Sequence, residues 1–129
     1  FSASFRANIG NYVYNGMAMS TGAWETVSYN SFQLNNLNNS YVKTGFKSRQ
    51  YLSDYYVENA SFLKLDNLSL SYNFGNVGRY ISGLTLSALV QNVFTITKYT
   101  GVDPEVPNGM DSSFYPRPRT YSLSIGLQF

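Results

Sequence analysis

The chain has 129 residues and a formal net charge of +2 at neutral pH, and 17% of its residues are aromatic but only 12% are charged. An average soluble domain carries about 25% charged residues, so this composition is poor in the groups that keep a soluble surface hydrated. The absence of cysteine and histidine, together with nine Lys and Arg residues that form no run, excludes disulfides, thiol or histidine catalysis and a nucleic-acid partner.

Alternation of apolar and polar side chains predicts four strands, at about 1–10, 61–74, 84–96 and 120–129. Successive side chains of a strand point to opposite faces, so each strand is apolar on one face and polar on the other. The apolar face of the second strand is expected to carry Phe62, Leu68, Leu70, Tyr72 and Phe74. Lys64 and Asp66 follow the same alternation and are expected at a rim beyond the apolar band.

The connections between these strands alternate in length. Long segments at about 11–60 and 97–119 flank a short Gly-containing link at about 75–83. Up-and-down strands place alternate connections on opposite sides, and outer-membrane barrels have long extracellular loops and short periplasmic turns. The pattern therefore predicts an all-β fold of antiparallel up-and-down strands in a transmembrane barrel, with 75–83 as the periplasmic turn. A half-buried sheet of a soluble sandwich shows the same alternation within a strand but does not sort its loops by side.

Four strands cannot close a barrel, because the smallest natural barrels have about eight. The sequence also opens directly on a strand pattern, at Phe1. We therefore expect the chain to be one piece of a longer protein that supplies the other strands.

The first long connection is rich in aromatic residues among Asn and Ser. A short helix is expected around 20–34, with Ser20 or Thr21 as its cap and Glu25 in its first turns. Aromatic side chains in such a loop either contact a substrate or partner or pack the loop on itself. The candidates for contact with substrate or partner are Trp24, Tyr29, Tyr41, Tyr51, Tyr55 and Tyr56.

The second long connection gathers three acidic residues, Asp103, Glu105 and Asp111. Carboxylates are ligands for Ca²⁺, but their spacing matches no EF-hand loop. We interpret them as a solvated acidic loop, or one held by Arg117 or Arg119. No spacing of carboxylates predicts glycoside hydrolysis, so the sequence predicts no catalytic, cofactor or metal site and no enzymatic activity.

The last strand alternates most strictly. Its apolar positions are Tyr121, Leu123, Ile125, Leu127 and Phe129. A terminal strand of this kind can be bound by β-augmentation during insertion into an outer membrane, and its apolar face can anchor in lipid. We predict that these residues form a barrel-assembly signal as well as a lipid contact.

Five strings of residues resemble, in order, the carboxy-terminal region of the SusC/RagA family of TonB-linked outer-membrane transporters. They are residues 10–15 (GNYVYN), 53–72 (SDYYVENASFLKLDNLSLSY), 86–95 (LSALVQNVFT), 99–105 (YTGVDPE), and 115–121 (YPRPRTY) with the strand to Phe129. Together they are distributed over nearly the whole chain beyond Gly10.

The resemblance implies a barrel of about 22 strands in the outer membrane of a Gram-negative bacterium, closed by an amino-terminal plug. It implies import of glycan or peptide oligomers, energised by TonB through an amino-terminal region that this chain lacks. The expected partners are the remainder of the same transporter, a SusD-like surface lipoprotein and membrane lipid. Two alternatives remain open, a structural or secretory barrel or adhesin, and a soluble carbohydrate-binding β-sandwich.

Overall fold

The computed structural model describes residues 1–27, 36–112 and 115–129, which divide into two compact units. Unit 1 comprises residues 1–8, 62–96 and 117–129, and unit 2 comprises residues 9–61 and 97–116. In chain order the elements are β1 (Ser2–Asn8), β2 (Tyr12–Asn15), α1 (Gly16–Thr21), the 3₁₀ turn η1 (Trp24–Thr26), α2 (Ser40–Thr44), the 3₁₀ turn η2 (Asp54–Tyr56), β3 (Val57–Asn59), β4 (Phe62–Gly75), β5 (Gly83–Thr97), β6 (Met110–Asp111) and β7 (Thr120–Gln128). Within the described ranges, no helix is both long enough and apolar enough to span a membrane.

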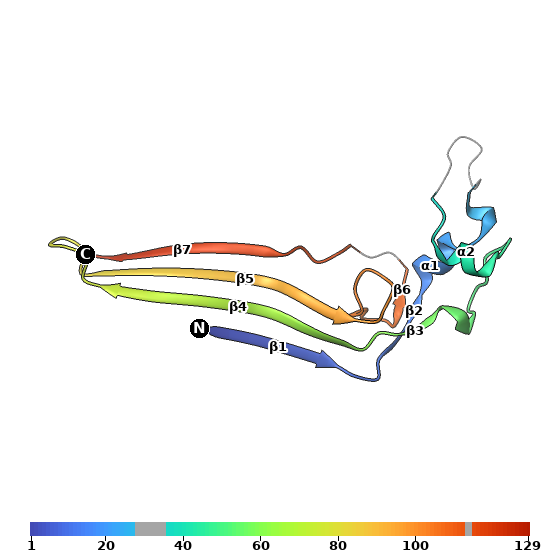
Figure 1. The fold of residues 1–129 in the computed structure, drawn as a ribbon, viewed down its shortest axis with the longest axis horizontal. Coiled ribbons are helices and arrows are strands. Elements are labelled where there is room, and N and C mark those ends of the chain that lie inside the picture. The colour runs from blue at the N-terminus through green and yellow to red at the C-terminus, as the bar shows by residue number, and fades with distance from the viewer. Residues whose placement is uncertain (28–35, 113–114) are drawn as a thin grey trace. The chain divides into compact units, whose positions relative to one another are not determined.

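Unit 1 is one four-stranded sheet in the order β1-β4-β5-β7. Neighbouring strands run in opposite directions, as the arrows in Figure 1 show. Each long strand therefore pairs with the next long strand along the chain. This is the antiparallel, up-and-down arrangement that the alternation predicts.

The ladder between β5 and β7 separates an apolar face from a polar one. Leu84 pairs with Leu127, Leu86 with Ile125, Ala88 with Leu123 and Val90 with Tyr121. The intervening pairs consist of small or polar residues, such as Ser87 opposite Ser124, except that Leu89 lies opposite Ser122. The Ser87 hydroxyl also lies 2.8 Å from the hydroxyl of Ser71 on β4. The polar face therefore continues from β5 onto β4. Partners opposite each other share a face, so the apolar side chains of β4, β5 and β7 gather on the other side of the sheet.

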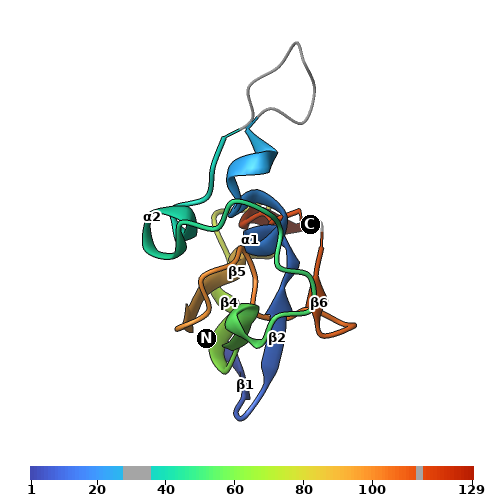
Figure 2. The same cartoon turned by 90° about the vertical axis from the view of Figure 1, so that its right-hand side faces the viewer.

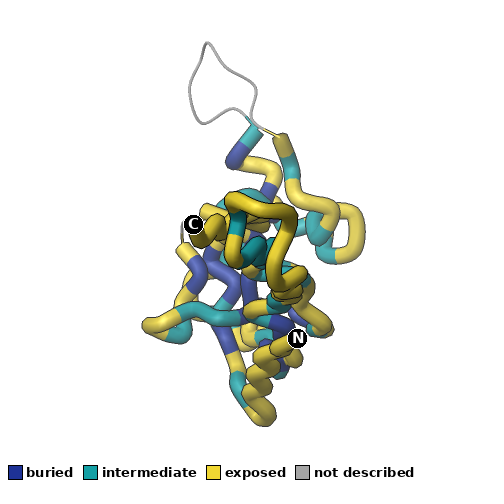
Figure 3. Tube along the Cα trace, turned by 90° about the vertical axis from the view of Figure 1, so that its left-hand side faces the viewer, coloured by how far each residue is buried: buried dark blue, intermediate teal, exposed yellow. Residues whose placement is uncertain are grey.

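The apolar face of β7 is exposed. Every residue of this strand is exposed to solvent, and Leu123 retains 76% of its accessible surface. The strand at the amino terminus is exposed along its length as well (yellow beside the label N in Figure 3). A sheet that presents large apolar side chains outward needs another apolar surface, of protein or of membrane, to cover them.

A β-bulge interrupts the pairing of β1 with β4. Ser4 pairs with Asn67 and Phe5 pairs with Leu65, so Asp66 is an extra residue on β4. Such an insertion locally disrupts the ladder, and a shift of one residue exchanges the two faces of the strand.

This bulge corrects the predicted face of β4. Phe62 and Lys64 lie on the face opposite Leu68, because the extra residue Asp66 stands between them and the later half of the strand. Asp66 accepts two hydrogen bonds from Arg6 of β1, at 2.9 Å and 3.1 Å, which ties the bulge to its partner strand. Lys64 is only 2% exposed, so its side chain is buried, and its rim position beyond the apolar band remains a prediction.

Unit 2 contains a second, smaller sheet in the order β3-β2-β6. β2 pairs antiparallel with β3 and parallel with β6, and α1 contacts β6 and η2. Figure 2 labels β2, β6 and α1. Its apolar core consists of Val13, Ala60 and Tyr99, with Val106 packed against them. The sequence predicted no strands at 11–60 and 97–119, because strands this short show no detectable alternation.

The first helix lies upstream of the one expected around 20–34. Asn15 caps α1 by accepting a hydrogen bond from the N–H of Ala18 at 2.9 Å. Ser20 and Thr21, expected as caps, instead donate to the carbonyl oxygen of Met17 in the last turn of α1. Residues 28–34 of the expected helix lie outside the described residues.

Candidate functional site

Two of the predicted aromatic contacts form a shelf on the surface of unit 2. The Trp24 and Tyr41 rings lie 6.1 Å apart between centroids and are tilted by 33°. They border an open hollow of about 460 Å³, completed by Gly45 and Lys47. Gly45 ends α2 in a left-handed conformation with φ of +62°, and open space lies where a side chain would project. Trp24 is 56% exposed, so this Trp24–Tyr41 shelf presents ring surface to solvent.

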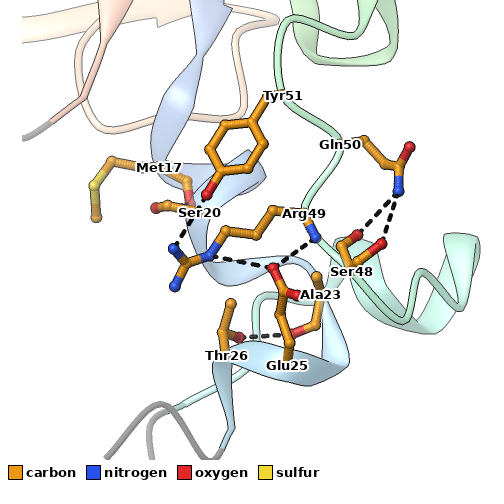
Figure 4. A network of polar contacts seen from close by, with 9 residues as sticks. All are labelled: Met17, Ser20, Ala23, Glu25, Thr26, Ser48, Arg49, Gln50 and Tyr51. Carbon is orange, nitrogen blue, oxygen red and sulfur yellow. Dashed lines mark hydrogen bonds and ion pairs between the residues drawn. The ribbon is translucent and has the colours of Figure 1, made fainter.

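Backbone and side-chain contacts hold the shelf in place. The N–H groups of Trp24 and Glu25 donate to the carbonyl oxygens of Phe46 and Lys47, at 2.9 Å and 3.0 Å. The Glu25 carboxylate accepts a hydrogen bond from the N–H of Arg49 at 2.8 Å and lies 3.7 Å from its Nε (Figure 4). These contacts join η1 to the segment after α2, and thereby fix Trp24 beside the end of α2.

The other aromatic candidates are placed differently. Tyr51 accepts a 3.5 Å contact from the Arg49 guanidinium (Figure 4), and Tyr55 meets Phe46 edge to face at 5.8 Å. Tyr56 is only 2% exposed, and burial raises its pKa, with smaller contributions from the neighbouring Tyr55 and Tyr14. Packing therefore accounts for Tyr56. Contact of any of these residues with a substrate remains a prediction, and Tyr29 lies outside the described residues.

A polar network crosses unit 2 and is buried at Asn15, Tyr99 and Asp111. The side-chain amide of Asn15 donates to Glu58 Oε1 at 2.8 Å and to the Thr100 hydroxyl at 3.2 Å. Thr100 donates to both oxygens of Glu58, from its hydroxyl at 2.7 Å and from its backbone N–H at 2.9 Å. The Tyr99 hydroxyl donates to Asp111 Oδ2 at 2.8 Å. Sequence reasoning missed this network, although an Asn directly before a helix is a recognisable N-cap.

Two cavities adjoin this network. One, of about 320 Å³, lies beside Tyr55, Tyr56 and Glu58, and the other, of about 280 Å³, lies beside Asn15 and Asp111. Both are lined by Ala18, Asn38 and Thr100. Cavities of this size approach those that hold small ligands.

The acidic residues of the second long connection are not a solvated loop. Asp103 and Asp111 are buried, at 6% and 1% exposure. Asp103 accepts the backbone N–H of Glu105 at 2.9 Å, and Asp111 accepts the Tyr99 hydroxyl. The prediction of solvated carboxylates was therefore wrong for these two residues, because the connection folds into unit 2. Within residues 1–27, 36–112 and 115–129, no three acidic side chains converge as metal ligands would.

The residues of the predicted assembly signal alternate along β7. Tyr121, Leu123, Ile125 and Leu127 share the apolar face through their pairing with β5. Phe129 follows the last residue of the strand and is exposed. Their geometry suits contact with lipid or with an added strand, and the assembly role itself remains a prediction.

Comparison with known sequences identifies relatives of one kind. No protein-family model matches the chain. It is 38% identical over 135 residues to the TonB-dependent receptor SusC of Bacteroides thetaiotaomicron, a match that covers 100% of this chain and 14% of the relative. It is 31% identical over 123 residues to the TonB-dependent receptor P39 of Formosa agariphila, which covers 84% of this chain and 11% of that relative.

Solved structures give the same relationship. The chain matches the RagAB peptide transporter with a TM-score of 0.74 and 27% identity, over 98% of this chain and 15% of that one. It matches the RagAB peptide importer in the "closed-closed" state with a TM-score of 0.76 and 28% identity, over the same shares. The relatives are named as receptors, transporters and importers and not as enzymes, in agreement with the predicted lack of enzymatic activity.

Proposed function

Because the chain belongs to the SusC/RagA family of TonB-dependent receptors, we propose that it forms the carboxy-terminal part of the barrel of an outer-membrane nutrient importer. β1, β4, β5 and β7 are then neighbouring strands of the barrel wall. Residues 11–60 and 97–119 lie on the extracellular side, and residues 75–83 form a periplasmic turn. The chain spans 14% and 11% of the two receptors described above, so the remainder of the importer supplies the other strands.

The observation that carries this proposal is the exposed apolar face of unit 1. The wall of a membrane barrel presents apolar side chains to lipid and polar ones to its interior. The pairs of β5 with β7 have this arrangement, with Leu123 opposite Ala88 on one face and Ser124 opposite Ser87 on the other. β1 and β7 each have one unpaired edge within the described sheet, and such edges require further strands.

We infer the substrate and partners from the relatives. One solved relative is named as a peptide transporter. The resemblance to SusC-type receptors implies that a SusD-like surface lipoprotein delivers oligomers to the receptor. The imported nutrient is therefore a glycan or peptide oligomer, and TonB acts through the rest of the receptor. The Trp24–Tyr41 shelf offers exposed aromatic surface on the extracellular side, which suits contact with such an oligomer or with the lipoprotein.

Native mass measurement of the detergent-solubilised protein tests this function. We expect a large complex that holds this chain within a longer receptor polypeptide, together with a lipoprotein identified by peptide mapping. A particle that dissolves without detergent at about the mass of this chain alone would contradict the proposal and favour the soluble β-sandwich.

Deletion of Phe129 is expected to lower the amount of folded receptor in the outer membrane without changing its transcript. The physical reason is that a terminal aromatic on an alternating strand strengthens its addition to the assembly machinery as an extra strand. The folded amount is measured from isolated outer membranes by gel electrophoresis, because the folded receptor in unheated samples migrates differently from the heat-unfolded receptor. Phe129→Tyr keeps the ring and is the matched control. An unchanged folded amount after the deletion would rule out the assembly role.

A further inference from the structure

A buried carboxylate in unit 2 has one oxygen without a hydrogen-bond partner. Asp111 lies on β6, opposite Asn15 of β2, and is 1% exposed. Its Oδ2 accepts the Tyr99 hydroxyl at 2.8 Å, whereas its Oδ1 is buried and makes no hydrogen bond in the part of the chain that the structure describes. Burial and the bond to Asp111 raise the pKa of Tyr99, so this phenol stays a donor to Oδ2.

Asp111 lines the cavity of about 280 Å³ described above. Asn15, Asn38, Thr21 and Thr100 supply the other polar lining, and Met17 and Val102 supply apolar surface. The cavity also adjoins the one of about 320 Å³ through their common lining residues. Asp111 therefore lines a space large enough for a small ligand group.

The charges around this space do not balance. None of the described residues that line the cavity is a Lys or Arg. Glu58, which bonds to Asn15, is satisfied by the neutral donors of Asn15 and Thr100. Lys43 lines only the neighbouring cavity. A buried carboxylate without a neutralising cation is costly, so the best occupant brings positive charge as well as hydrogen-bond donors.

We propose that the cavity beside Asp111 binds a primary ammonium group. A neutral hydroxyl would satisfy Oδ1 but leave the charge unbalanced, whereas an ammonium supplies three N–H donors and the charge together. In this proposal Asp111 Oδ1 accepts one N–H, and the lining residues Asn38 and Thr21 are polar neighbours of the bound group. The ammonium belongs to the amino terminus or a lysine of a peptide, or to an amino sugar. The inference deepens the proposed function and rests on it, because the amine is taken to be part of the imported oligomer.

The test is a calorimetric titration of the purified full-length receptor in detergent, with paired probes that differ in charge. n-Butylammonium is compared with n-butanol, tri-alanine with N-acetyl-tri-alanine, and glucosamine with glucose. We expect each ammonium probe to bind at least about tenfold more tightly than its neutral partner, because a charge-assisted hydrogen bond is roughly twice as strong as a neutral one. The second and third pairs distinguish a peptide source from an amino-sugar source.

Asp111→Asn tests the assigned residue, because it keeps the shape of the side chain and removes its charge. We expect this variant to abolish the preference for the ammonium probes, and Asp103→Asn, a buried carboxylate of the same connection that does not line the cavity, to retain it. Equal affinity of the wild-type receptor for charged and neutral probes, or no binding of either, would overturn the proposal without any variant. A receptor that extracts as a membrane complex yet shows no such preference would refute the ammonium site while leaving the importer function intact.

Discussion

Leu123→Arg is expected to destabilise the assembled barrel by about 2–4 kcal/mol, the cost of an arginine on the lipid face near the bilayer midplane. Leu123 lies near the middle of β7, on the apolar face, opposite Ala88. Its side chain is 76% exposed in the isolated sheet, so the substituted guanidinium would meet lipid and not a protein partner. Equilibrium unfolding of the full-length receptor by urea in lipid bilayers measures the change.

The matched control is Ser124→Arg, one residue along the same strand. Ser124 pairs with Ser87, whose hydroxyl contacts that of Ser71 on the polar face. We expect a much smaller loss there, because lumen-facing charges remain in water. A neutral effect of Leu123→Arg, or equal losses for the two variants, would contradict the assignment of the apolar face to lipid.

Alternation of residue types predicted β5 and β7 closely because these strands pair without an extra residue along their common ladder. Each side chain then keeps the face that its position in the sequence gives it. The same reasoning failed in β4, where the inserted residue Asp66 places Phe62 and Leu68 on opposite faces of the strand. The bulge does leave a mark in the sequence, because Leu63 and Leu65 share the face of Leu68 and the alternation of leucines therefore shifts by one residue at Asp66. A single unbroken period from Phe62 onward overlooked this shift.

The fold of unit 2 could not be predicted from local pattern. β2, β3 and β6 have four residues or fewer, too short to show a period. Polar bonds between distant residues connect them, since Asn15 is 43 positions from Glu58 and 85 from Thr100. The acidic residue Asp111 was recognised as a candidate from its type, but its buried, half-satisfied state depends on these long-range contacts.

Asn15→Ala is expected to have the second large effect, on the stability of unit 2. Asn15 is 2% exposed, and its side chain both caps α1 and donates to Glu58 and Thr100. Loss of an N-cap costs about 1 kcal/mol, and loss of a hydrogen bond to a charged group costs about 1.5–3 kcal/mol. We therefore expect the unit to open more easily by about 2–4 kcal/mol.

Hydrogen exchange of the amides of β2 and β3 in the full-length receptor measures this opening. A loss of that size lowers their protection by roughly 30- to 1,000-fold, at 1.4 kcal/mol for each factor of ten. Asn11→Ala is the matched control, because the Asn11 side chain makes one long contact of 3.5 Å to the carbonyl oxygen of Pro104. We expect its protection to change by less than about tenfold.

A second variant separates the two roles of Asn15. Asn15→Asp keeps an oxygen to cap α1, since aspartate is as good an N-cap as asparagine. It also replaces the N–H donor that lies 2.8 Å from Glu58 with a second carboxylate, and like charges at this separation repel strongly. We therefore expect Asn15→Asp to lower protection at least as much as Asn15→Ala. Wild-type protection in Asn15→Asp would mean that the cap alone matters, and that the bond to Glu58 contributes little to the stability of unit 2.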